Sequence, residues 1–163
     1  MAQPDLQFQD FLMQVNDDYQ DFVHKVHELL LKDEYKCNVG TSKTALFSIK
    51  YTQGRKGIFN FMLRKKGFKA SVYAANFAKY LDVLNRLPES MVNQIVKVSS
   101  CKNIAEPGTC MGKCIGYDFY IREDHYQKCK FSCFQFNVDA ESIPFLLELL
   151  QSELDARCAA SVN

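Results

Sequence analysis

The spacing of hydrophobic residues near the start of the sequence predicts two helices. A short apolar stripe from Leu6 to Val15 indicates the first. Asn16 is a favourable N-cap for the second, and Asp17 and Asp18 suit a first helical turn. Apolar residues then recur at helical spacing as far as Lys32: Tyr19, Phe22, Val23, Val26, Leu29 and Leu30. We therefore expect a longer second helix that ends near Lys32.

The hydrophobic period changes to two in the next segment. The alternating runs are residues 45–51, 58–64 and 68–73. Short glycine-containing turns separate these runs, as in an antiparallel meander. Residues 35–39 are a candidate strand before them. One face of the predicted sheet is apolar and the other polar, which is typical of a sheet with one face in water.

Helical spacing returns after the meander. Asn76 is a candidate cap for a helix whose apolar stripe is Phe77, Tyr80, Leu81 and Leu84. Pro88 ends that helix and begins another short one, with its inward positions at Met91, Val92, Ile95 and Val96. Residues 99–116 show no regular period, and irregular stretches of this length are usually functional.

The last third of the chain predicts a hairpin and a final helix. Strands are expected at residues 117–121 and 134–138, with a turn at 122–125. Ser142 is a candidate cap because Pro144 is tolerated in a first helical turn. The expected buried stripe is Leu146, Leu147, Leu150 and Leu154. The whole pattern predicts one α+β domain over residues 1–163. Its single antiparallel sheet of five or six strands packs against helices, with an irregular cysteine-containing loop before the last hairpin.

Composition narrows the class of protein. The 163 residues are 47% hydrophobic and 24% charged, as in ordinary globular proteins. No apolar run approaches the roughly 20 residues that a membrane-spanning helix needs. The first residues lack the basic and apolar regions of a signal peptide, which predicts a cytoplasmic protein. In that compartment the seven cysteines are expected to be thiols, metal ligands or redox groups.

Charge is unevenly distributed although the net charge is only +1. From Tyr35 to Leu81 the sequence has ten lysines and arginines and no acid, whereas residues 5–34 are mostly acidic. Lys50, Arg64 and Lys69 on the polar sheet face suggest binding of an anionic ligand or nucleic acid. The simpler interpretation is a solvated sheet face, with the acidic first helices neutralising the strands.

Five cysteines gather in the second half, with the spacing C-x8-C-x3-C-x14-C-x3-C. Thiolates from a loop and a neighbouring hairpin commonly hold a structural zinc ion, which would also order a loop without a core. The expected ligands are Cys101, Cys110, Cys114 and Cys129. Cys133 is left out because it is expected inside a strand. His125 is an alternative to Cys101.

Other interpretations of these residues stay open. The cysteines can equally be buried, unreactive thiols or a redox pair, for which Cys110 and Cys114 are the candidates. Cys37 and Cys158 are expected to be structural. His24 and His27 have a spacing that can hold a metal, although they flank an apolar stripe. The sequence contains no G-x-S-x-G, P-loop or G-x-G-x-x-G motif, so it predicts no catalytic residues.

The runs at residues 63–67 and 72–74, with the segment from Cys101 to Cys129, resemble small uncharacterised bacterial proteins of α+β fold. The resemblance extends over nearly the whole chain and implies no activity. The sequence therefore predicts a non-enzymatic binding or accessory protein with a structural zinc site. A cysteine-dependent redox enzyme or sensor, and an anion- or nucleic-acid-binding domain, are the alternatives.

Overall fold

The computed structural model describes residues 4–43, 45–100, 106, 108, 114 and 116–161. The described helices are α1 (Pro4–Gln14), α2 (Asp17–Lys32), the 3-10 helix η1 (Phe77–Lys79), α3 (Leu81–Asn85), α4 (Glu89–Lys97) and α6 (Ser142–Ser161). The described strands are β1 (Lys36–Gly40), β2 (Phe47–Gln53), β3 (Lys56–Arg64), β4 (Gly67–Val72), β5 (Tyr117–Ile121), β6 (Asp124–Lys128) and β7 (Gln135–Asn137). The predicted α+β class is confirmed. None of these helices is long and apolar enough to cross a membrane.

The main sheet is antiparallel and has the order β1-β2-β3-β4-β7. The predicted meander is therefore confirmed as β2, β3 and β4, and the candidate strand before it is β1 at the edge. Gly54 adopts a φ of 61° in the turn between β2 and β3, a conformation that glycine takes at no steric cost.

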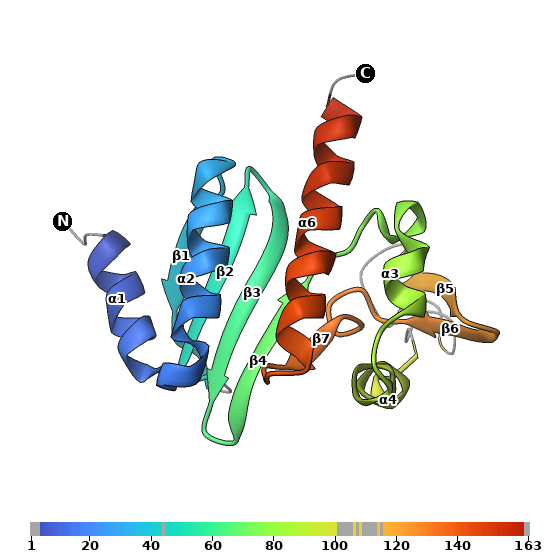
Figure 1. Ribbon diagram of the computed structural model, residues 1–163, viewed down its shortest axis with the longest axis horizontal. Helices are drawn as coiled ribbons and strands as arrows, with labels where there is room; N and C mark the ends of the chain where they lie inside the picture. Colours follow the sequence, from blue (N-terminus) through green and yellow to red (C-terminus); the bar gives the residue numbers. More distant parts are fainter. Residues whose placement is uncertain are drawn as a thin grey trace.

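Helices cover one face of this sheet. Figure 1 shows α2 in front of β1 and β2, and α6 in front of β3 and β4. Phe61 of β3 lies at the centre of the covered face. Its ring packs 6.0 Å from that of Phe11 in α1, 5.6 Å from that of Phe22 in α2 and 5.6 Å from that of Phe68 in β4. Because every second residue of a strand faces the same side, the polar residues of β2–β4 occupy the opposite face.

The second half of the chain differs from the prediction. β5 pairs with β6 in a separate two-stranded sheet, and β7 pairs with β4 in the main sheet. The predicted single sheet and the predicted hairpin between residues 117–121 and 134–138 are therefore wrong. Residues 124–128, predicted to begin in a turn, form β6. Figure 1 shows β5, β6, α3 and α4 beyond the β7 edge of the main sheet.

Two helix starts are also corrected. Asn76 makes no side-chain cap; η1 and α3 follow it in place of one helix, and its amide binds a carboxylate on α6 instead. Ser142 is not the cap but the second member of a capping box, three residues after Asp139. The Ser142 N–H donates to Asp139 Oδ1 at 2.7 Å, and the Asp139 N–H donates to Ser142 Oγ at 3.0 Å.

Smaller differences concern two inward positions. Val96 is exposed although an inward position was predicted, and Leu149 is fully buried where Leu147 was expected. Most of residues 99–116, including Cys101 and Cys110, lie outside the described residues.

Candidate functional site

The uncovered sheet face carries the three basic residues that the sequence singled out. Lys50 of β2 lies opposite Asn60 of β3, and Lys69 of β4 lies opposite Met62. Arg64 follows Met62 by two residues. Since residues two apart on a strand share a face, the structure places Lys50, Lys69 and Arg64 on the same side of the sheet. That placement agrees with the sequence pattern.

The three residues border two separate hollows. Lys50 lines a cleft of about 820 Å³, and Arg64 and Lys69 line a hollow of about 530 Å³. We call the first the basic cleft because the described residues that line it include no carboxylate and five cations: Lys50, Arg55, Lys56, Lys130 and Arg157. We call the second the Arg64 hollow.

Different parts of the fold contribute these cations. Lys50 comes from β2, and Arg55 and Lys56 come from the turn into β3 and its first residue. Lys130 lies between β6 and β7, and Arg157 lies near the end of α6. Arg157 forms an ion pair with Glu153. In the described part of the chain, the other four cations have no carboxylate within 4.0 Å. Their charges are therefore available to a ligand.

Aromatic rings form much of the remaining wall of the basic cleft. The ring of Tyr73 meets that of Phe131 edge to face, with 6.3 Å between their centroids. Lys130 Nζ lies 5.7 Å from the centroid of the Tyr117 ring, within cation–π range. Phe131 is 58% exposed, so its ring is accessible from solvent.

Gly57 allows Tyr73 to lie close against β3. A Cβ at residue 57 would sit 3.0 Å from the Tyr73 ring, so a larger residue would push the ring away. The Tyr73 hydroxyl accepts a hydrogen bond of 2.9 Å from Asn60 Nδ2. The ring is thereby held on the uncovered sheet face.

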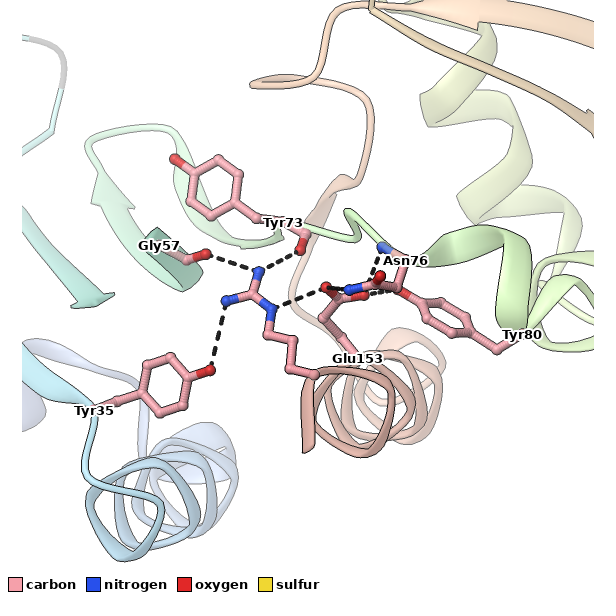
Figure 2. Close-up of polar contacts among 7 residues, drawn as sticks. Tyr35, Gly57, Tyr73, Asn76, Tyr80 and Glu153 are labelled. Carbon is pink, nitrogen blue, oxygen red and sulfur yellow. Dashed lines mark hydrogen bonds and ion pairs between the residues drawn. The ribbon is translucent and has the colours of Figure 1, made fainter. Parts of the chain in front are cut away.

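Arg157 ties this wall to α6. Figure 2 shows Gly57, Tyr73 and Glu153, three of the residues that Arg157 joins. Nη2 donates to the carbonyls of Gly57 at 2.9 Å and Tyr73 at 3.2 Å, and Nε donates to Glu153 Oε1 at 2.9 Å. Nη1 donates to the Tyr35 hydroxyl at 3.5 Å. Most N–H donors of the Arg157 guanidinium are thus used within the protein. Arg157 therefore acts chiefly by positioning the chain at Gly57 and Tyr73.

Glu153 is fully buried and compensates the charge of Arg157. Its carboxylate accepts hydrogen bonds from the Tyr80 hydroxyl at 2.6 Å, the Asn76 N–H at 3.1 Å and Asn76 Nδ2 at 3.0 Å (Figure 2). A buried carboxylate is stable only with such partners. Glu153 and Arg157 therefore fix the chain around residues 73–76, next to the basic cleft.

Burial and this carboxylate also affect two tyrosines. Burial, together with the hydrogen bond to Glu153, raises the pKa of Tyr80 far above its ordinary value. Burial, with a smaller contribution from the Glu153 charge, raises the pKa of Tyr117 to about 12. Both hydroxyls therefore stay protonated at neutral pH.

Sequence reasoning missed Glu153, Arg157 and Lys130. The first two are separated by four residues, and Glu153 falls within an otherwise apolar stripe of α6. An acid in a buried stripe with an arginine four residues later is the signal that would have found them. The sequence contains no comparable signal for Lys130, because the position of the segment before β7 depends on the pairing of β7 with β4.

The structure tests the predicted zinc site only in part. Cys101 and Cys110 lie outside the described residues, whereas Cys114 and Cys129 are half-buried. In the described ranges, no group of three or more histidine, cysteine or acidic side chains can hold a metal ion. His125, the alternative ligand, forms an exposed ion pair in which its Nε2 lies 2.6 Å from Asp118 Oδ1. The zinc site stays a prediction.

Cys133 and His27 pack within the fold, whereas Cys158 does not. Cys133 is buried in the turn before β7, not in a strand, and burial raises the pKa of its thiol. Cys158 is exposed, contrary to a structural role in the core. His27 stacks on Phe8 with 3.6 Å between ring centroids, and its Nδ1 lies 2.9 Å from the Tyr51 hydroxyl. These contacts favour packing over metal binding.

No protein-family model, curated protein or solved structure matches this chain. The geometry of the basic cleft is therefore the basis for a functional proposal.

Proposed function

We propose that this chain is a binding protein for a ligand that carries phosphate groups, and that the ligand occupies the basic cleft. One observation carries the proposal: Lys50, Arg55, Lys56 and Lys130 converge on the cleft from three parts of the fold, and none of the described residues in its lining carries a carboxylate. A solvated sheet face would not require cations from the turn before β3 and from the segment after β6.

The chemistry of the lining supports a phosphate ligand with an aromatic group. Lysines act as point charges, and the planar fork of Arg55 can bind two phosphate oxygens at once. The rings of Tyr73 and Phe131 offer a face or an edge to a flat group. A cleft of about 820 Å³ is within the size range of small-molecule sites.

The acidic helices do not neutralise this site. Among the described residues, no ion pair joins α1 or α2 to the sheet. Helix α2, which carries the acids, lies on the covered face (Figure 1), whereas Lys50 and Asn60 of the cleft lining lie on the opposite face. Because screening by salt weakens interactions beyond about 10 Å, the acids on the far side reduce the positive potential only partly.

The experiment is calorimetric titration with ATP, which combines a triphosphate with an aromatic base. We expect binding that weakens as salt rises, and weaker binding of adenosine. The double variant Lys50→Gln/Lys56→Gln should lose about tenfold in affinity, because each partly screened contact contributes about 0.7 kcal/mol. Lys32→Gln, on the last turn of α2, is the matched control and should bind like the unmodified protein. Absence of ATP binding, or equal loss in the double variant and the control, would refute the proposal.

The predicted structural zinc site is a separate proposal with its own test. It is compatible with the binding function, since none of the four expected ligands is among the residues that line the basic cleft. Metal analysis of protein purified without added metal should give about one zinc ion per chain. Protein that contains no zinc and whose cysteines all react readily with thiol reagents would exclude it.

A further inference from the structure

The Arg64 hollow is a second basic region on the uncovered sheet face. Among the residues that the structure describes, its lining has no carboxylate and five cations: Lys43, Arg64, Lys65, Lys66 and Lys69. It lies at the opposite end of β3 from the basic cleft, because Lys56 is the first residue of that strand and Arg64 the last. With a rise of about 3.3 Å per residue, the two ends are about 26 Å apart.

Arg64, which lines this hollow, has an unused hydrogen-bond donor. Its Nε is buried and has no hydrogen-bond partner among the described residues. Within the same part of the chain, the one acceptor for its Nη2 is Met62 Sδ at 3.9 Å, and thioether sulfur is a weak acceptor. A buried N–H without a partner is unfavourable, and a phosphate oxygen of a ligand would supply the acceptor.

A basic surface connects the two regions. Lys50 at the basic cleft and Lys69 at the Arg64 hollow are two strands and two residues apart in the register of β2, β3 and β4. That offset corresponds to about 12 Å between their Cα atoms. All four strands from β1 to β4 lack acidic residues, so no carboxylate of this meander interrupts the path.

We infer that the ligand is a single-stranded nucleic acid that lies along β3 from the basic cleft to the Arg64 hollow. The inference rests on the proposed function of the basic cleft and adds the second anion site. A linear polyanion is the ligand that uses two basic regions about 26 Å apart at once. Exposed Phe131 and the neighbouring Tyr73 ring can stack with unpaired bases, whereas the bases of a duplex are already stacked.

The test is fluorescence anisotropy with labelled oligothymidylates of about 3, 6 and 12 nucleotides, a range that covers typical single-strand sites. Affinity should rise about tenfold or more from the shortest to the longest as the Arg64 hollow becomes occupied. A duplex of the same length should bind more weakly. Arg64→Gln should weaken binding of the longest oligomer about fivefold and leave ATP binding in the basic cleft unchanged. Lys32→Gln is again the control, and circular dichroism of each variant checks its fold.

Several results would overturn the inference. Affinity that does not depend on length, or an Arg64→Gln variant that binds the long oligomer normally, would exclude the second site. Tighter binding of the duplex would indicate double-stranded nucleic acid instead, and equally tight binding of polyglutamate would indicate an acidic protein partner. These outcomes leave ATP binding intact, whereas failure of ATP to bind refutes the proposed function itself.

Discussion

Glu153 shows how one buried residue organises the neighbourhood of the basic cleft. It has no exposed surface, and its carboxylate joins Arg157 on α6 to Tyr80 and Asn76. Arg157 in turn holds the carbonyl of Gly57 at the start of β3. The position of the aromatic wall therefore depends on a carboxylate that the sequence placed in a hydrophobic stripe.

Replacement of this carboxylate should be costly. In Glu153→Gln the amide keeps one acceptor but leaves the guanidinium of Arg157 without a negative partner. We expect a loss of about 3 kcal/mol in the free energy of unfolding, as for other half-removed buried ion pairs. Urea denaturation measures the loss. Glu148→Gln on the same helix removes an exposed partner of Arg86 and should change stability little. Equal stability of the two variants would show that the Glu153 network is not structural.

The described cysteines differ sharply in accessibility. Cys133 is fully buried and its pKa is raised by burial, whereas Cys158 on the last turns of α6 is exposed. Since the thiolate is the reactive form, we expect iodoacetamide to modify Cys158 in the folded protein and Cys133 only after unfolding. Mass spectrometry of peptides at successive times measures both rates. Modification of Cys133 as fast as Cys158 would contradict the burial of Cys133 in the folded protein.

At the scale of elements, α6 begins with a reciprocal pair rather than a single cap. Asp139→Ala removes the acceptor of the Ser142 N–H and should reduce stability by about 1 kcal/mol. Asp139→Asn retains an acceptor oxygen and should recover most of that loss. Thermal unfolding followed by circular dichroism gives the comparison. If the alanine and asparagine variants are equally stable, the capping interpretation is incorrect.

The elements that the sequence predicts best have local causes. Each strand from β2 to β4 alternates apolar and polar residues and is joined to the next by a short turn, so pairing follows from chain order. β7 has only three residues, and nothing near it indicates that it pairs with β4. β6 lacks a clear alternation, since its sequence is Asp-His-Tyr-Gln-Lys. The positions of β6 and β7 therefore depend on contacts between distant parts of the chain, which the local pattern does not show.

The candidate site likewise contains some residues that the sequence pattern predicts and others that it does not. Lys50, Arg64 and Lys69 were placed on one sheet face because alternation along a strand fixes the face. Lys130 and Arg157 reach the basic cleft from segments whose positions depend on β7 and on the Glu153 network. Their contribution becomes visible only in the folded chain.

At the scale of the whole molecule, buried tyrosines link stability to pH. Burial raises the pKa values of Tyr51, Tyr80 and Tyr117 above the ordinary value of 10.0, to about 12 for Tyr117. Above pH 10 the unfolded chain releases these protons and the folded chain retains them. Burial raises the pKa of the Cys133 thiol in the same way, from an ordinary value of 9.0. The free energy of unfolding should therefore begin to fall near pH 9 and fall more steeply above pH 10, where each of the three tyrosines adds up to about 1.4 kcal/mol per pH unit.

Urea denaturation between pH 8 and pH 11 checks this dependence, at about equal salt concentration throughout. Tyr117→Phe removes one of the three groups and should make the decline above pH 10 less steep. A free energy of unfolding that stays constant over this range would mean that the tyrosines are not buried in the folded protein.

The central claim is that cations gather on one side of the molecule, beside accessible aromatic rings. The most direct test is nuclear magnetic resonance of ¹⁵N-labelled protein titrated with inorganic triphosphate. We predict shifts of the amide signals of Gly57, Lys130 and Phe131 and of the Arg157 Nε–H signal, with little change in α2. Shifts concentrated in α2, or no shifts at any triphosphate concentration, would contradict the assignment of the basic cleft as an anion-binding site.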